Sequence, residues 1–150
     1  MKATGIIRRI DDLGRVAIPK EIRRKMRIRE GDPLEFFLDG FDGLVLKRYS
    51  PLAESLCPKA AENALKKERI RFAVYDKDFR LSGSYQDSFP SVVPVTWSDN
   101  DKMFVDGAFT VFKIFSVGEL LGYIAVTETD KTEYVKAIVS MIGEELSFFE

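Results

Sequence analysis

Most of the residues able to do chemistry stand in the first 29 positions, where ten lysines and arginines face three acids and give a net charge of +7. The whole chain has a net charge of −1. Positive charge gathered in one short segment suits contact with a nucleic acid, because neutralising phosphates supplies the sequence-independent part of the affinity. The residues therefore indicate DNA binding.

Little else in the sequence could support catalysis or hold a metal. The chain has no histidine and a single cysteine, Cys57, which excludes histidine-dependent triads, histidine-ligated metals and an intramolecular disulfide. We expect Cys57 to be a buried small hydrophobe. The neighbouring acids Asp11 and Asp12 are expected to accept hydrogen bonds in a turn. We predict no enzyme activity, no catalytic residue, no cofactor and no metal.

Charge divides the chain into two parts. Residues 1–52 carry twelve basic and eight acidic side chains, whereas residues 53–150 carry eleven basic and sixteen acidic ones. Because an acidic surface repels phosphate, only the first part is a credible nucleic-acid contact. The Ser50-Pro51 pair punctuates the chain at the same place. The sequence therefore predicts two domains, residues 1–51 and 52–150.

The first part is expected to be a small module of strands and one helix. Residues 20–26 should form the helix after Pro19, with Ile22 and Met26 on one side and basic residues largely on the other. Strands are predicted at residues 4–11, 15–18, 34–38 and 44–49. About fifty residues can bury only a small core, and small domains commonly compensate by forming oligomers. Neither face of the first predicted strand is purely apolar, as a simple two-sided sheet would require. We therefore expect this part to interleave with a second copy of the chain.

The second part is predicted to be an antiparallel sheet flanked by helices, which makes the chain an α+β protein. Ser50 and Pro51 should begin the first helix, and Asp130 with Glu133 should form the capping box of the last one. Strands are predicted at residues 71–75, 80–85, 104–115 and 121–127, with a loop over residues 86–102. The terminal aromatic pair, Phe148 and Phe149, fits either the core or a contact between subunits.

The segment TGIIRRIDDLGRVAIPKEIRRKMRIREGDPLEFFLDGFDGLVLKRYSP resembles, almost end to end, the N-terminal domain of the AbrB/SpoVT transition-state regulators. The ordered series T-G-I-x-R, D-x-L-G-R, I-P-x-E-x-R-R, G-D-x-L-E and L-K-x-Y carries the resemblance. It implies a swapped-hairpin β-barrel made by two chains, DNA binding by arginines, and a setting in sporulation or transition-state control.

The resemblance also implies which side chains contact DNA. The family's DNA-contacting arginines correspond by position to Arg8, Arg15, Arg23 and Arg24, and Arg9 stands at a site that is basic in the family. Charge and place in the pattern add three lysines to this set, Lys2, Lys20 and Lys47.

The second part, from RFAVYDKDFRLSGS through GELLGYIAVTETD to the final helix, resembles the GAF-like C-terminal domain of the SpoVT branch. That resemblance implies a domain that pairs dimers into a tetramer. In a GAF domain a helical region usually builds one wall of the ligand pocket. Residues 86–102 replace that region here with a predicted loop, so the sequence does not identify a ligand.

Together these features predict a bacterial, cytoplasmic DNA-binding transcriptional regulator with no membrane span. Its expected partners are double-stranded DNA and further copies of itself, as a dimer through the first domain and a tetramer through the second. Two alternatives remain open. One is a MazE-type antitoxin, which shares the barrel and binds a toxin through a short, acidic, unfolded tail. The other is a regulator whose GAF-like domain senses a metabolite.

Overall fold

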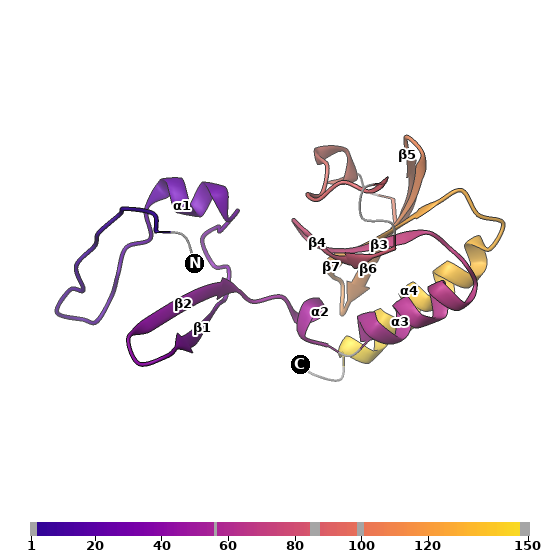
Figure 1. Cartoon of the computed structure of the whole chain (residues 1–150). Helices are drawn as coiled ribbons and strands as arrows, with labels where there is room; N and C mark the ends of the chain where they lie inside the picture. The colour runs from indigo at the N-terminus through magenta and orange to yellow at the C-terminus, as the bar shows by residue number, and fades with distance from the viewer. Residues whose placement is uncertain (1–2, 56, 85–87, 99–100, 148–150) are drawn as a thin grey trace. The chain divides into compact units, whose positions relative to one another are not determined.

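The computed structural model describes the chain except residues 1–2, 56, 85–87, 99–100 and 148–150. Figure 1 shows two compact units, Met1–Tyr49 and Ser50–Glu150. Lys2, Phe148 and Phe149 lie outside the described residues, as does the side chain of Cys57. None of the described helices is long and apolar enough to cross a membrane.

In the first unit the structure describes the predicted helix and the second of the two predicted strand pairs. Helix α1 spans Lys20–Lys25 directly after Pro19, and strands β1 (Leu34–Asp39) and β2 (Gly43–Arg48) pair antiparallel. The helix ends in a Schellman motif, in which the N–H of Ile28 donates to the Arg23 carbonyl at 2.8 Å and the N–H of Arg27 donates to the Arg24 carbonyl at 3.2 Å. Arg27 there has a φ of 51°.

The strands predicted at residues 4–11 and 15–18 are wrong for the single chain, which has no strand over residues 3–18. Only the turn between them forms, where the N–H of Asp11 donates to the Arg15 carbonyl at 3.0 Å and the N–H of Gly14 donates to the Asp11 carbonyl at 3.1 Å. Gly14 has a φ of 74°, which glycine adopts without strain. A strand exists only with a ladder partner, and β1 and β2 pair with each other instead.

The first unit has no core of its own. None of residues 3–49 is buried. Opposite pairs on one face of the β1–β2 hairpin, Phe36 with Leu46 and Leu38 with Leu44, are all exposed, and Leu38 keeps 85% of its surface in solvent. Contiguous exposed apolar faces are typical of surfaces that contact another chain or segment.

The second unit is built on a five-stranded antiparallel sheet with the order β4-β3-β7-β6-β5. Its strands are β3 (Phe72–Asp76), β4 (Arg80–Gly83), β5 (Met103–Asp106), β6 (Phe109–Ser116) and β7 (Glu119–Thr127). The β3–β4 hairpin and β7 confirm the predictions. The single strand predicted at residues 104–115 is wrong, because Gly107, with a φ of 59°, reverses the chain between β5 and β6.

The helices of the second unit are α2 (Pro51–Glu54), α3 (Cys57–Lys67) and α4 (Thr132–Leu146). Ser50 caps α2 as predicted, its hydroxyl accepting a hydrogen bond from the Ala53 N–H at 3.3 Å. The capping box of Asp130 and Glu133 is wrong, because α4 begins later, with Lys131 at the N-cap position and no side-chain cap hydrogen bond. A 3-10 turn, η2 (Val95–Ser98), lies within the predicted loop 86–102.

Two hydrophobic clusters lie on opposite faces of this sheet. Phe72, Ile114 and Ile124 belong to the cluster that includes residues of all three helices, which therefore cover one face (Figure 1). Tyr75 and Trp97 belong to the cluster on the other face, which the segment of residues 88–98 covers. Helices therefore flank the sheet, as predicted, but α2, α3 and α4 all lie on the same face of it.

Candidate nucleic-acid interface

The turn of residues 11–15 in the first unit holds Arg15 in place through Asp11. The Asp11 carboxylate accepts hydrogen bonds from the backbone N–H groups of Leu13 at 3.0 Å and Arg15 at 2.8 Å, and from the Arg15 Nε at 2.8 Å. The backbone hydrogen bond from Arg15, followed by that of its guanidinium, lowers the pKa of Asp11. Asp11 thus has the expected role in the turn, while 70% of the Arg15 side-chain surface stays in solvent.

Arg8 and Arg9 lie on the limb that leads into this turn, and both are exposed. Arg8 donates through Nη1 to the carbonyl oxygen of its neighbour Ile7 at 2.9 Å. That single local bond uses one of the five N–H donors of the guanidinium. The side chain therefore keeps donors for an incoming phosphate.

Helix α1 supplies a second group of cations. Lys20 stands at its first position and Arg23 and Arg24 stand in its last turn, all three exposed. The negative end of the helix dipole favours cations in that turn. Lys25, exposed in the same turn, is a further cation that the family motifs do not mark and that its charge alone would have flagged.

Lys47 and Lys2 stand apart from these groups. The Lys47 Nζ lies 4.6 Å from the centroid of the Phe37 ring on the β1–β2 hairpin, which is a cation–π contact. Lys2 is outside the described residues. The predicted residues that the structure describes thus occupy three places in the unit, namely the limb and turn of residues 8–15, helix α1 and strand β2.

This arrangement suits binding to phosphates and base edges. A guanidinium is planar and permanently charged, and it can donate two parallel hydrogen bonds to one phosphate or one guanine. A lysine offers only a point charge. Among the described residues, no group of three or more His, Cys, Asp or Glu side chains could hold a metal ion.

Comparison with known proteins agrees with this reading. Residues 7–53 match the family described as antidote-toxin recognition MazE, bacterial antitoxin. Stage V sporulation protein T of Bacillus subtilis (strain 168) is 72% identical over 54 residues, which are 36% of this chain and 30% of that protein. The transition state regulatory protein AbrB of the same organism is 51% identical over 51 residues, or 34% of this chain and 52% of that protein.

The putative transition state regulator Abh, also from Bacillus subtilis (strain 168), is 47% identical over 51 residues, or 34% of this chain and 54% of that protein. The matches thus span from under a third to about half the length of these relatives, and none of the three is named as an enzyme. The chain therefore carries a MazE/AbrB-type domain and is related through it to the AbrB-family transition-state regulators.

Proposed function

We propose that this chain is a bacterial, cytoplasmic DNA-binding transcriptional regulator that acts on sporulation or transition-state genes. The observation that carries the proposal is the exposure of Arg8, Arg9, Arg15, Arg23 and Arg24 in a segment with a net charge of +7. The names of the three relatives, a sporulation protein and two transition-state regulators, support the setting.

Residues 1–51 would bind DNA as a dimer, in a swapped-hairpin β-barrel. Support comes from the first unit, in which none of residues 3–49 is buried and the segment of residues 3–18 has no strand partner. A second copy would supply both the strand partner and the cover for exposed apolar side chains. It would pair with the backbone of residues 4–18 and cover the apolar face of Leu38 and Leu44.

Binding would begin with electrostatic capture of the duplex by two symmetric sets of arginines, which displaces condensed counterions from the phosphates. Arg15, fixed by Asp11, would enter the complex with part of its side-chain freedom already lost, which lowers the entropy cost of the contact. Phosphate contacts alone set register without reading sequence, so selectivity would come from groove shape and a few base contacts.

Residues 52–150 would form a GAF-like domain that joins two dimers into a tetramer. An antiparallel sheet with helices on one face and its own core supports an independent domain of this type. Two DNA-binding dimers in one particle would raise the apparent affinity, because the second contact becomes intramolecular.

The proposal is tested by titrating the full chain and its Arg15→Ala and Arg23→Ala variants with duplex DNA across a salt series. Each variant should bind more weakly, and loss of one phosphate contact should lower the slope of log affinity against log salt by about 1. Lys77→Ala is the matched control, since Lys77 lies in the acidic second unit, where its Nζ pairs with Glu119 at 2.6 Å. Equal affinity in all four proteins would overturn the assignment.

The match to a family named for antitoxins favours a second candidate function, capture of a toxin as well as DNA. In a MazE-type antitoxin the toxin would meet an unfolded acidic tail. Here residues 50–150 contain two hydrophobic clusters around a sheet, which weighs against that function. Protection of residues 50–150 from protease in the absence of any partner would separate the two candidates.

A further inference from the structure

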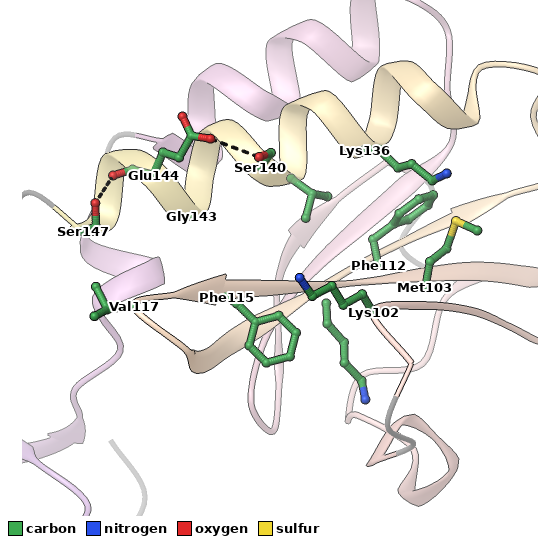
Figure 2. Close-up of a pocket in the computed structure, with 12 residues that line it drawn as sticks. Lys102, Met103, Phe112, Phe115, Val117, Lys136, Ser140, Gly143, Glu144 and Ser147 are labelled. Atoms are coloured by element: carbon green, nitrogen blue, oxygen red, sulfur yellow. Dashed lines mark hydrogen bonds between the residues drawn. The ribbon is translucent and has the colours of Figure 1, made fainter.

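The second unit contains an open groove between helix α4 and the β5–β6 edge of the sheet (Figure 2), with a volume of about 640 Å³. Its walls include the apolar side chains of Met103, Phe112, Phe115 and Val139. Small-molecule sites are concave and mostly apolar, hold a few polar groups and enclose about 300–1,000 Å³. In size and lining, the groove therefore resembles a ligand site.

The groove exists because β5 is shorter than its neighbour. Strand β5 pairs with β6 only from Met103 opposite Phe112 to Asp106 opposite Phe109. Past Lys113, whose N–H donates to the Lys102 carbonyl at 2.9 Å, no described strand follows β6 on this side. Helix α4 meets β6 closely at Gly143, where an added Cβ would lie 2.1 Å from the Phe115 carbonyl oxygen. One end is thus closed by backbone contact, and the space beside it stays open.

Three lysines line this apolar space. Lys113 is buried, with its Nζ 5.5 Å from the centroid of the Phe104 ring, so Lys102 and Lys136 are the exposed cations beside the groove. Lys102 is exposed and makes no ion pair with any residue that the structure describes. Figure 2 shows its side chain reaching toward the space between Phe115 and α4. Lys136, on α4, pairs through Nζ with Glu133 at 2.7 Å, an exposed contact of little strength. These cations lie in a part of the chain whose acids outnumber its bases by sixteen to eleven.

Glu144, the acidic residue in the groove lining, makes its hydrogen bond along α4 and not with Lys102. Glu144 accepts a hydrogen bond through Oε1 from the Ser140 hydroxyl at 3.2 Å, and Figure 2 shows the two side chains joined along α4. The charge available to a ligand is therefore positive at Lys102, with apolar surface beside it.

Val117, at the mouth of the groove, is exposed over 74% of its surface and has a φ of 44°. A β-branched residue is strained in this conformation, which glycine or asparagine would fill more easily. Covering this exposed apolar side chain with an apolar ligand is favourable, because it removes apolar surface from water.

We propose that this groove binds a small organic anion with an apolar body, a carboxylate on a medium-length aliphatic or an aromatic group. The carboxylate pairs with the Lys102 ammonium, and the apolar body lies against Phe115, Met103 and Val117. A carboxylate matches the single cationic point of Lys102, and the apolar body displaces water from the groove walls. This site lies within the second unit and is independent of DNA binding by the first.

The chain offers a direct probe of this groove, because its four methionines include Met103 in the wall, Met141 on α4 outside the lining and Met26 in the first unit. The full-length protein, labelled at the methionine methyl groups, is titrated with octanoate while its NMR signals are followed. We expect the Met103 signal to move in a saturable way and the Met26 signal to stay in place.

Three further ligands separate the contributions of charge and tail. Octanol has the tail without the charge, octylammonium has the opposite charge, and acetate has the charge without the tail. Each should bind more weakly than octanoate. Equal binding of octanol and octanoate would overturn the assigned role of Lys102, and an unmoved Met103 signal would overturn the site.

Two variants and a control complete the test. Lys102→Gln should weaken octanoate binding about tenfold, as loss of a charge-assisted hydrogen bond implies, whereas Lys59→Gln, at an exposed position of α3, should leave it unchanged. Val117→Asn should weaken binding while raising the melting temperature, which separates loss of the wall from loss of the fold. A Met103 signal that moves with protein concentration but not with octanoate would show that a second copy covers the groove, which contradicts the proposal.

Discussion

The two units of this chain differ most in how much of their apolar surface they bury themselves. In the first unit, Phe36 exposes 67% and Leu38 85% of their surfaces, and no residue from 3 to 49 is buried. In the second, Ile124, Ile142 and Trp97 are fully buried. Burial of apolar surface is the main term that stabilises a fold. The second unit thus contains its own stabilising core, whereas residues 3–49 of the first form none by themselves.

The largest expected effect comes from producing the two units as separate fragments, residues 1–52 and residues 50–150. Residues 50–150 alone should stay folded on dilution, because their core forms within one chain, even where dilution separates the proposed tetramer. Residues 1–52 alone should be folded only as a dimer, so each tenfold dilution should lower their apparent stability by about 1.4 kcal/mol. Denaturation followed by circular dichroism at several concentrations measures both. A monomeric, concentration-independent fragment 1–52 would break the comparison.

A core substitution in the second unit should have the next largest effect. Trp97 packs edge-on against Tyr75, with ring centroids 4.9 Å apart, and its Nε1 donates to the Asp106 carboxylate at 2.5 Å. Trp97→Ala should therefore lower the free energy of unfolding by about 3–5 kcal/mol at any protein concentration. Val95→Ala in the same turn, where 89% of the side chain is exposed, is the control and should change it little. Chemical denaturation compares the two, and similar losses would show that this face of the sheet is loosely packed.

High pH should weaken the second unit through Tyr75. Burial raises the pKa of Tyr75 to about 12 from an ordinary value of 10.0. Because the folded state holds this proton more tightly than the unfolded state, the stabilisation is complete below pH 10 and falls as the pH rises toward 12. The loss should reach roughly 2–3 kcal/mol, at 1.36 kcal/mol for each unit of pKa.

Denaturation of the wild type and of Tyr75→Phe between about pH 9 and 12 measures this effect. The variant also loses the hydrogen bond from the Tyr75 hydroxyl to the Pro90 carbonyl, at 2.9 Å, so its stability should be lower but less dependent on pH in this range. Parallel pH profiles would mean that another group titrates.

The smallest expected effect is a gain in stability at the β6–β7 turn. Val117, with a φ of 44°, precedes Gly118, with a φ of 83°. Val117→Asn should relieve the strain and stabilise the second unit by about 1 kcal/mol, because asparagine tolerates the left-handed region better than valine does. Thermal unfolding measures the gain, and Val117→Ala, which keeps a Cβ without branching, should gain less. A loss of stability in both variants would show that the valine makes a favourable contact in the protein.

Local signals predicted much of the fold correctly. Pro19 marked the start of α1, Ser50 and Pro51 marked the start of α2, and alternating apolar residues marked the β1–β2 hairpin. The strand predicted at residues 104–115 failed because Gly107 reverses the chain. Other predictions failed where the outcome depended on pairing or contact with another segment. The segment of residues 4–18 has strand-forming residues without a strand edge to pair with. At the start of α4, where the sequence predicts a local capping box, Lys131 instead contacts Glu68, 63 positions away.

The candidate interface was predictable as a set of residues, because the charge of residues 1–29 and the family motifs mark them directly. The hydrogen bonds from Arg15 to Asp11 also depend on near neighbours, because they lie within a turn of five residues. Lys25 carried a charge signal only, since no motif position marks it.

By itself, the sequence determined the division of charge, the identity of the basic residues and the elements that close over a few positions, because those depend on contacts between near neighbours. Only the tertiary structure decided the strand order β4-β3-β7-β6-β5, the placing of α2, α3 and α4 on one face of that sheet, and the groove beside Phe115. These features depend on which distant segments pair and on where one strand ends before its neighbour. That choice is made by the packing of the whole unit, and no short stretch of residues encodes it.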